Sequence, residues 1–198
     1  MTNTDPDPTV RRIEGTEVSR AIDTLTMAFA ADPTMRWLWP ESDVYLRSFP
    51  RLVAAFGGRA FQHAGAHADD GFGGVALWLP PGVTPDGDAV VALFRETVPQ
   101  PRLDDALGML DAMEEHTPED AHWHLAFIGV DTSRQGEGLG GHVMREGVGM
   151  CDEEGVPGYL ESSNPGNIPF YQRHGYEIVG EIQVGSSPVL TPMWRDRR

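Results

Sequence analysis

Two different spacings of apolar residues alternate along the chain, and each change of spacing marks a change of element. Apolar positions three and four residues apart predict amphipathic helices at 17–30, 42–61, 87–98, 103–115, 139–154 and 168–174. Short apolar or alternating runs predict strands at 10–13, 63–68, 75–79, 122–130, 159–162, 176–182 and 189–194. The two kinds of element are interspersed without an internal repeat. We therefore expect an α+β fold, a mixed sheet of six or seven strands with helices on both faces.

Three segments depart from these regular patterns. Thr16 is predicted to cap the first helix, and Pro50 to interrupt or shift the second. Residues 34–40 carry Met35, Trp37, Leu38 and Trp39 and are too apolar for a plain surface loop. They either fill the core or line a pocket.

Length and composition indicate one soluble domain. The chain has 198 residues, of which 40 % are hydrophobic and 23 % charged. No apolar run approaches the length of a membrane span. Residues 1–9 are polar and acidic, so we predict a disordered tail there rather than a signal peptide, followed by a single domain over 10–198. The single cysteine, Cys151, excludes an internal disulfide, which favours a cytoplasmic protein, and its apolar neighbours predict a buried helix residue.

The net charge of the chain limits the classes of partner that it is expected to bind. The net charge is −15, and the sequence contains no lysine, so all fifteen basic residues are arginine. Such a surface repels nucleic acid and anionic lipid, and we expect neither a nucleic-acid nor a membrane partner. It attracts cationic amines. An equally good interpretation of the acidity is solubility alone.

A strand, a glycine-rich loop and a helix follow one another at residues 122–154. Glycines occupy 136, 138, 140 and 141, directly before the helical pattern begins. The first amides of a helix have no intrahelical partner and carry the positive end of its dipole. Because glycine has no Cβ, an anion can reach these amides. The segment therefore predicts an anion site.

The sequence allows more than one anion. A nucleoside triphosphate is disfavoured because the phosphate loop that binds it requires a lysine. A dinucleotide fits Gly136-x-Gly138-x-x-Gly141, with Glu161 at the spacing of a ribose-binding acid. However, most of the chain precedes this loop, whereas the dinucleotide fingerprint normally opens its sheet. The segment Gln135-Gly-Glu-Gly138-Leu-Gly140 also fits Q/R-x-x-G-x-G/A, a pyrophosphate-binding loop.

This last pattern resembles the GNAT superfamily of N-acetyltransferases, and two further segments share the resemblance. One is the strand ending Ile128-Gly-Val130, and the other is Asn164 through Tyr176, which contains Phe170-Tyr171 and Gly175-Tyr176. Asn167 stands where the pattern usually has alanine. Segments around Ala28–Pro33, His116–Pro118 and Leu160–Tyr171 are also similar to puromycin N-acetyltransferases. That similarity is weakest over 87–115.

The resemblance implies a mostly antiparallel sheet with one splayed pair of parallel strands, 122–130 and 159–162, and a cosubstrate, acetyl-CoA, bound between them. It implies transfer of the acetyl group to the amine of a small molecule by direct attack on the thioester. Tyr171 matches the family's general acid, unless it only packs. The residues that the resemblance implies for acetyl-CoA binding are Ile128, Val130, Arg134, Gln135, Gly136, Gly138, Leu139, Gly140, Gly141, Asn164, Asn167 and Tyr171.

The general base is less well defined by the sequence. Glu161 lies on the second splayed strand, where it either assists deprotonation of the amine or forms a structural pair with an arginine. His124 and then His122 are the alternatives, although a histidine on a strand more often has a structural role. By simple alternation, both histidines share a face with Ala126 and Ile128 and oppose Trp123 and Phe127. The histidines and Cys151 show no metal-ligand spacing.

Three functions remain compatible with the sequence: an amine N-acetyltransferase, a catalytically silent acyl-CoA sensor of the same fold, and a dinucleotide-dependent oxidoreductase. We predict a monomer or a homodimer.

Overall fold

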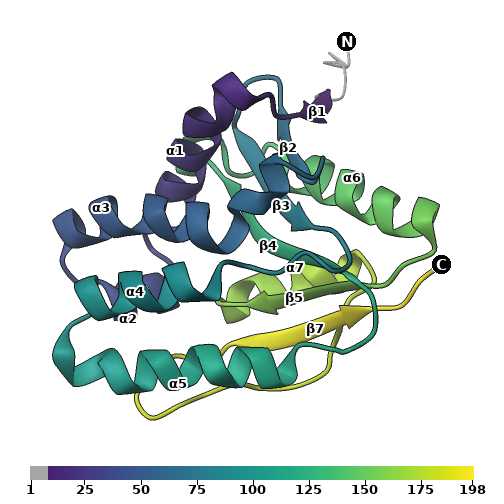
Figure 1. The fold of residues 1–198 in the computed structure, drawn as a ribbon. Coiled ribbons are helices and arrows are strands. Elements are labelled where there is room, and N and C mark those ends of the chain that lie inside the picture. The colour runs from purple at the N-terminus through teal and green to yellow at the C-terminus, as the bar shows by residue number, and fades with distance from the viewer. Residues whose placement is uncertain (1–8) are drawn as a thin grey trace.

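A computed structural model describes residues 9–198, and Figure 1 shows the fold. Seven strands form one sheet in the order β1-β2-β3-β4-β5-β7-β6. Their bounds are β1 Val10–Arg12, β2 Ala66–Asp69, β3 Gly74–Leu79, β4 Trp123–Val130, β5 Gly158–Ser162, β6 Glu177–Ile178 and β7 Thr191–Arg195. The predicted tail over 1–9 lies outside the described residues except for Thr9. No helix in the described part of the chain is both long and apolar enough to cross a membrane.

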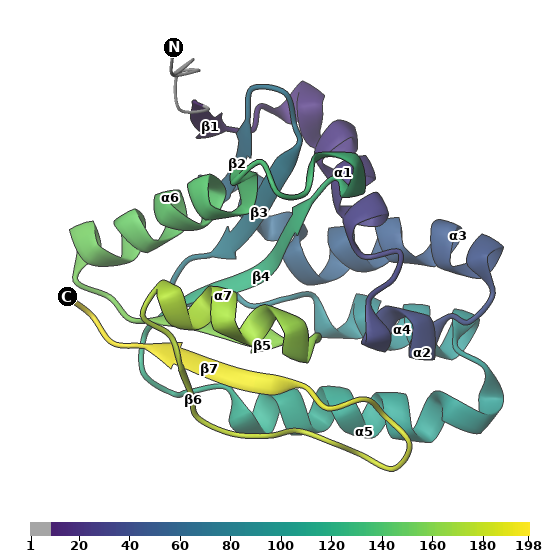
Figure 2. The same ribbon diagram turned by 180° about the vertical axis from the view of Figure 1, so that it is seen from behind.

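The sheet is antiparallel except between β4 and β5. These two strands pair only at their first residues, Trp123 with Gly158 and His124 with Tyr159. Beyond this point they separate, and Figure 2 shows β4 and β5 diverging from the middle of the sheet. The predicted fold class, including the splayed parallel pair, is confirmed.

Helices cover both faces of the sheet, as predicted (Figures 1 and 2). The core of one face packs under α1, α3, α4 and α5, and the core of the other lies under α6 and α7. Side chains of β3 alternate between the two cores, since Leu77 belongs to the first and Trp78 to the second. The α-helices are α1 Val18–Ala28, α2 Pro33–Leu38, α3 Ser42–Leu52, α4 Gly87–Thr97, α5 Gln100–His116, α6 Leu139–Glu154 and α7 Ile168–Arg173.

A β-bulge at Ala126 changes the direction of the side chains in the middle of β4. Leu77 lies opposite Phe127, whereas its neighbour Trp78 lies opposite Leu125, so Ala126 is the extra residue. Trp123 and Leu125 therefore enter the core under α6, and Phe127 enters the opposite core. The predicted alternation, which placed Phe127 opposite His124, is wrong, because both rings contact Phe56 on the same side of the sheet.

Two predicted helix boundaries also change. Thr16 lies inside a short 3-10 turn, Gly15–Glu17, and does not cap α1. The predicted helix 42–61 is α-helical with Pro50 inside it as far as Leu52. It then widens to a π-helix at Val53–Gly57 and tightens to a 3-10 helix at Gly58–Phe61.

Residues 34–40, whose structure was left open, form most of the short helix α2. Asp32 caps this helix, because its carboxylate accepts hydrogen bonds from the amides of Thr34 and Met35. Pro33 takes the first helical position, where its missing N–H costs nothing. The two alternatives both hold: Trp39 is fully buried in the core, while Met35 and Leu38 line a pocket.

Candidate active site

The predicted glycine loop joins β4 to α6. Gly136 and Gly138 have φ angles of +88° and +81°, and Gly138 is the N-cap residue of α6. Residues other than glycine rarely adopt these angles, so both positions require glycine for the turn itself. The loop thus leads into the first amides of a sixteen-residue helix, which have no intrahelical partner.

Arg134 supports the shape of this loop. Its Nε and Nη2 atoms lie 3.0 and 2.9 Å from Oε2 of Glu137, and Nη1 lies 3.2 Å from Oδ2 of Asp69. Asp69 itself accepts hydrogen bonds from the amides of Gly71 and Gly74. The guanidinium therefore ties the glycine loop to the turn between β2 and β3, and its predicted role toward the pyrophosphate stays a prediction.

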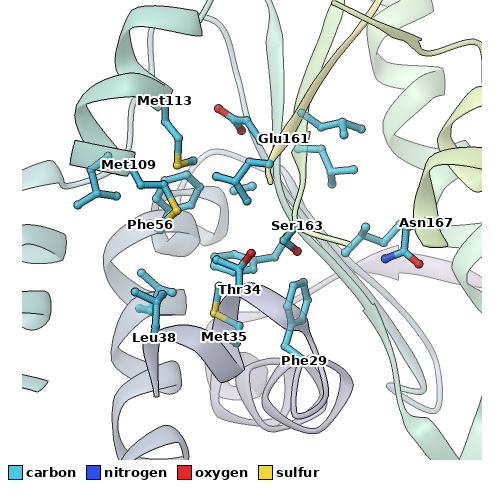
Figure 3. A pocket seen from close by; sticks show the side chains of 18 of the residues that line it. Phe29, Thr34, Met35, Leu38, Phe56, Met109, Met113, Glu161, Ser163 and Asn167 are labelled. Atoms are coloured by element: carbon cyan, nitrogen blue, oxygen red, sulfur yellow. The ribbon is translucent and has the colours of Figure 1, made fainter. Parts of the chain in front are cut away.

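A pocket occupies the space that opens where β4 and β5 separate. Residues 125–128 of β4 form one side, and Leu160 and Glu161 of β5 form another. Phe29, α2 and α5 enclose it, with Met109 and Met113 of α5 at one end (Figure 3). Most of the lining is hydrocarbon, aromatic ring or thioether. The polar side chains that line it belong to Thr34, Glu161, Ser163, Asn167 and Tyr171.

Glu161 and His124 form a hydrogen-bonded pair beside this pocket. Nε2 of His124 lies 2.8 Å from Oε2 of Glu161, and the two side chains are only 11 % and 5 % exposed. A carboxylate accepts, so we assign the Nε2 proton to His124. The prediction left open an arginine as the partner of Glu161, and the partner is instead a histidine. This arrangement holds the Glu161 carboxylate at the pocket, where His124 orients it.

His122 and Tyr159 extend this cluster away from the pocket. The His122 ring lies 5.4 Å from that of Tyr159 and 6.4 Å from that of His124, and its Nδ1 is 2.7 Å from the carbonyl oxygen of Asp120. Burial lowers the pKa of His122, and burial together with the charge of Glu161 raises that of Tyr159. Neither residue lines the pocket, whereas Glu161 does.

Tyr171 reaches the same pocket from α7. Its side chain is 7 % exposed and packs against Phe170 and Tyr176. Burial, and then the negative charge of Asp32, raise the pKa of its phenol well above the ordinary value. The hydroxyl therefore stays protonated at neutral pH, as a proton donor must.

Sequence reasoning missed a polar link between two segments that lie 131 residues apart in the chain. Ser163, just after β5, donates a 2.7 Å hydrogen bond to Oδ2 of Asp32, which caps α2. Asp32 is 7 % exposed, and the burial of its carboxyl raises the pKa even though three hydrogen bonds oppose the shift. The link holds α2, and with it Thr34, against the strand that carries Glu161. Asp32-Pro33 was a visible helix-start signal, but its partner lies 131 residues away.

Two further predicted site residues, Asn164 and Asn167, lie in the segment that leads into α7. Asn164 caps the turn before α7, since its Oδ1 accepts from the amide of Gly166, and Asn167 lines the pocket. Cys151 is fully buried in the core under α6, as predicted, and burial raises the pKa of its thiol to about 12. Residues 9–198 contain no cluster of three His, Cys, Asp or Glu side chains that could hold a metal ion.

These features define a class of protein. A mostly antiparallel sheet, one splayed parallel pair, a glycine loop opening a helix, and a pocket in the gap are the elements of a coenzyme A-dependent acyltransferase fold. A dinucleotide-binding sheet is mostly parallel, whereas this sheet is antiparallel except between β4 and β5. The model of the Acetyltransferase (GNAT) family matches residues 33–176, more than half of the chain, so the protein belongs to this family of N-acetyltransferases.

Individual relatives agree with this placement. An uncharacterised N-acetyltransferase of Schizosaccharomyces pombe is 28 % identical over 92 % of this chain and 80 % of its own length. A structure of a histone acetyltransferase HPA2 and related acetyltransferase from Corynebacterium glutamicum has a TM-score of 0.69 at 22 % identity, covering 98 % of both chains. The polyamine N-acetyltransferase of Drosophila melanogaster has a TM-score of 0.64 at 14 % identity, covering 96 % of this chain and all of that one. The resemblance to puromycin N-acetyltransferases stays a prediction.

Proposed function

We propose that the protein transfers the acetyl group of acetyl-CoA to the amine of a small molecule, with Glu161 as the base and Tyr171 as the acid. The observation that carries the proposal is one pocket lined by both side chains, in the gap between two separated parallel strands. Direct transfer requires the amine, a base and an acid to meet at the thioester, and a pocket lined by both Glu161 and Tyr171 supports this arrangement.

The chain offers a fitting cradle for acetyl-CoA. Gly136 and Gly138 hold the backbone in positive-φ conformations, and an added Cβ at Gly140 would lie 3.3 Å from Val130. The amides from Gly136 to Gly141 would hold the pyrophosphate, and the free backbone groups of Ile128 and Val130 would bind the pantetheine arm. Gln135, Leu139, Asn164 and Asn167 complete the proposed site. When bound there, acetyl-CoA supplies the activated acetyl group.

The residues at the pocket divide the proton transfers between them. Glu161 accepts the proton of the incoming ammonium ion, and His124 keeps the carboxylate oriented. The freed amine can then attack the thioester carbonyl, whose oxygen the amide of Val130 would polarise. Tyr171 donates its proton to the leaving sulfur. The proton that the amine nitrogen loses on becoming an amide returns to Tyr171 through solvent.

The charge distribution suits a cationic acceptor. The chain has a net charge of −15, and the pocket presents the Glu161 carboxylate inside an apolar wall. A carboxylate there attracts an ammonium ion before it accepts its proton.

A panel of small primary amines tests the proposal, with acetyl-CoA-dependent release of free thiol as the readout. Acetylation of any member supports it. Thermal stabilisation by acetyl-CoA without turnover of any amine would favour a silent acyl-CoA sensor instead. Stabilisation by NAD or NADP, and not by acetyl-CoA, would favour an oxidoreductase and overturn the proposal.

A further inference from the structure

One buried hydroxyl in the pocket has no partner in the protein. Thr34 is 1 % exposed and lines the pocket, and within residues 9–198 its Oγ1 has no hydrogen-bond partner. Its backbone amide is already bound to Asp32. Buried hydroxyls in folded proteins are nearly always paired, because an unpaired one loses its bonds to water without replacement. A group from outside the protein is therefore the natural partner of Oγ1.

Most of the side chains around Thr34 are apolar, and the Ser163 hydroxyl is the labelled polar group beside it in Figure 3. Figure 3 shows Thr34 beside Met35 and Phe29, with Leu38 on the same side of the pocket, whereas Glu161 lies toward the opposite end near Met113. An acceptor whose ammonium group meets Glu161 would thus extend an apolar body toward Thr34. A hydroxyl both donates and accepts, so its partner can be a hydroxyl, an ether or a carbonyl oxygen.

The polar link described above fixes this spacing. Ser163 follows Glu161 by two residues, and its hydroxyl binds the same Asp32 carboxylate that accepts from the amide of Thr34. The two recognition points, Glu161 and Thr34, therefore sit on elements that this link locks to each other.

We infer that Thr34 determines acceptor specificity: the protein selects a primary amine with an aromatic or hydrocarbon body and one oxygen remote from the amine. This inference rests on the proposed function and names the class of substrate. Polyamines fit poorly, because the residues that line the described pocket include one carboxylate, and a second ammonium ion would meet apolar side chains.

The test compares 2-phenylethylamine with its 2-, 3- and 4-hydroxy and methoxy derivatives, and with spermidine, on wild-type protein. At least one oxygenated isomer should exceed the parent amine by roughly tenfold in kcat/KM, the effect of one net hydrogen bond. Thr34→Val removes the hydroxyl at nearly constant shape and should erase this preference, so that kcat/KM for the preferred oxygenated isomer falls to the level of the parent amine measured on the same variant. Thr34→Ser should retain the preference. Because Oγ1 has no hydrogen-bond partner within residues 9–198, the Val variant should have a Tm equal to or above that of wild type.

The outcomes separate this inference from the proposed function. Acetylation of the amines with no isomer preferred, or with spermidine preferred, overturns the inference and leaves the function standing. The same holds if the Val variant keeps the preference, or if it weakens acetyl-CoA binding, which would assign the hydroxyl to the cosubstrate. Release of no thiol with any amine contradicts the proposed function itself. The wild-type preference is measured independently of the folding of any variant.

Discussion

Replacing Glu161 by glutamine tests the proposed base most specifically. The substitution keeps the shape of the side chain and one hydrogen-bond acceptor toward His124, which lies 2.8 Å away. It removes the negative charge and the basicity. We expect kcat/KM for a primary amine to fall by on the order of 10²-fold near neutral pH, the typical contribution of one general base. Activity should recover partly at high pH, where more of the amine is already neutral.

The cost in stability should be small by comparison. A charge-assisted hydrogen bond is roughly twice as strong as a neutral one, so the change of Glu161 removes about 1 kcal/mol from the free energy of unfolding. For a chain of this length that lowers Tm by roughly 2–4 °C. The matched control is Glu153→Gln, on the exposed side of α6, which should change neither quantity. Steady-state kinetics over a range of pH, together with calorimetric Tm values, measure all of these effects.

A double-mutant cycle of Glu161 and His124 distinguishes a catalytic role of Glu161 as the base from a purely structural pairing of the two side chains. If the two side chains act as a unit, His124→Asn combined with Glu161→Gln should lower kcat/KM little further than Glu161→Gln alone. A rise in KM with unchanged kcat would reduce Glu161 to binding the cation. A Glu161→Gln variant with native kcat/KM at pH 7 would refute both the catalytic and the cation-binding role of Glu161. His124 and then His122 would become the candidates for the general base.

Three further predictions concern other parts of the site and the core. Tyr171→Phe should lower kcat roughly 10²-fold and leave the acetyl-CoA dissociation constant nearly unchanged, and wild-type kcat with chemistry limiting the rate would reduce Tyr171 to packing. Gly138→Val should abolish acetyl-CoA binding in calorimetry, because φ is +81° there and a branched side chain would block the loop. The control is Gly149→Val in α6, where an added Cβ meets nothing within 4 Å, and this variant should bind acetyl-CoA normally. Burial lowers the pKa of His67 to about 4, so folding keeps this imidazole neutral; the stability it contributes is present above its unfolded pKa of about 6.5 and is lost as pH falls toward 4. In denaturation experiments at a series of pH values, His67→Gln should reduce the fall in the free energy of unfolding over this pH range by roughly 1–3 kcal/mol. An unchanged dependence on pH would contradict this role.

The elements that the sequence predicts well are those whose cause is local. The order of β4, glycine loop and α6 follows from glycines that the backbone needs at 136 and 138, next to an apolar strand and an amphipathic helix. Glu161 and Tyr171 were assigned from residues near each other in the chain together with the family resemblance, and the structure places both at one pocket.

The features that the sequence did not predict depend on residues that are distant in the chain. The bulge at Ala126 arises from how β3 pairs with β4, and a single extra residue reverses the face of every later side chain, including Phe127. The bond between Asp32 and Ser163 joins segments 131 residues apart. Its consequence, that Thr34 lines the same pocket as Glu161, cannot be derived from the spacing of either segment.

Acetyl-CoA labelled with ¹³C in its carbonyl carbon provides the most direct test of the central claim. The protein is incubated with this substrate and an oxygenated 2-phenylethylamine, and the products are followed by NMR while released thiol is counted. The account predicts that the label appears as an amide on the amine nitrogen, one for each thiol released, and that Glu161→Gln slows both together. Thiol release with the label in free acetate, or no release with any amine, would contradict it.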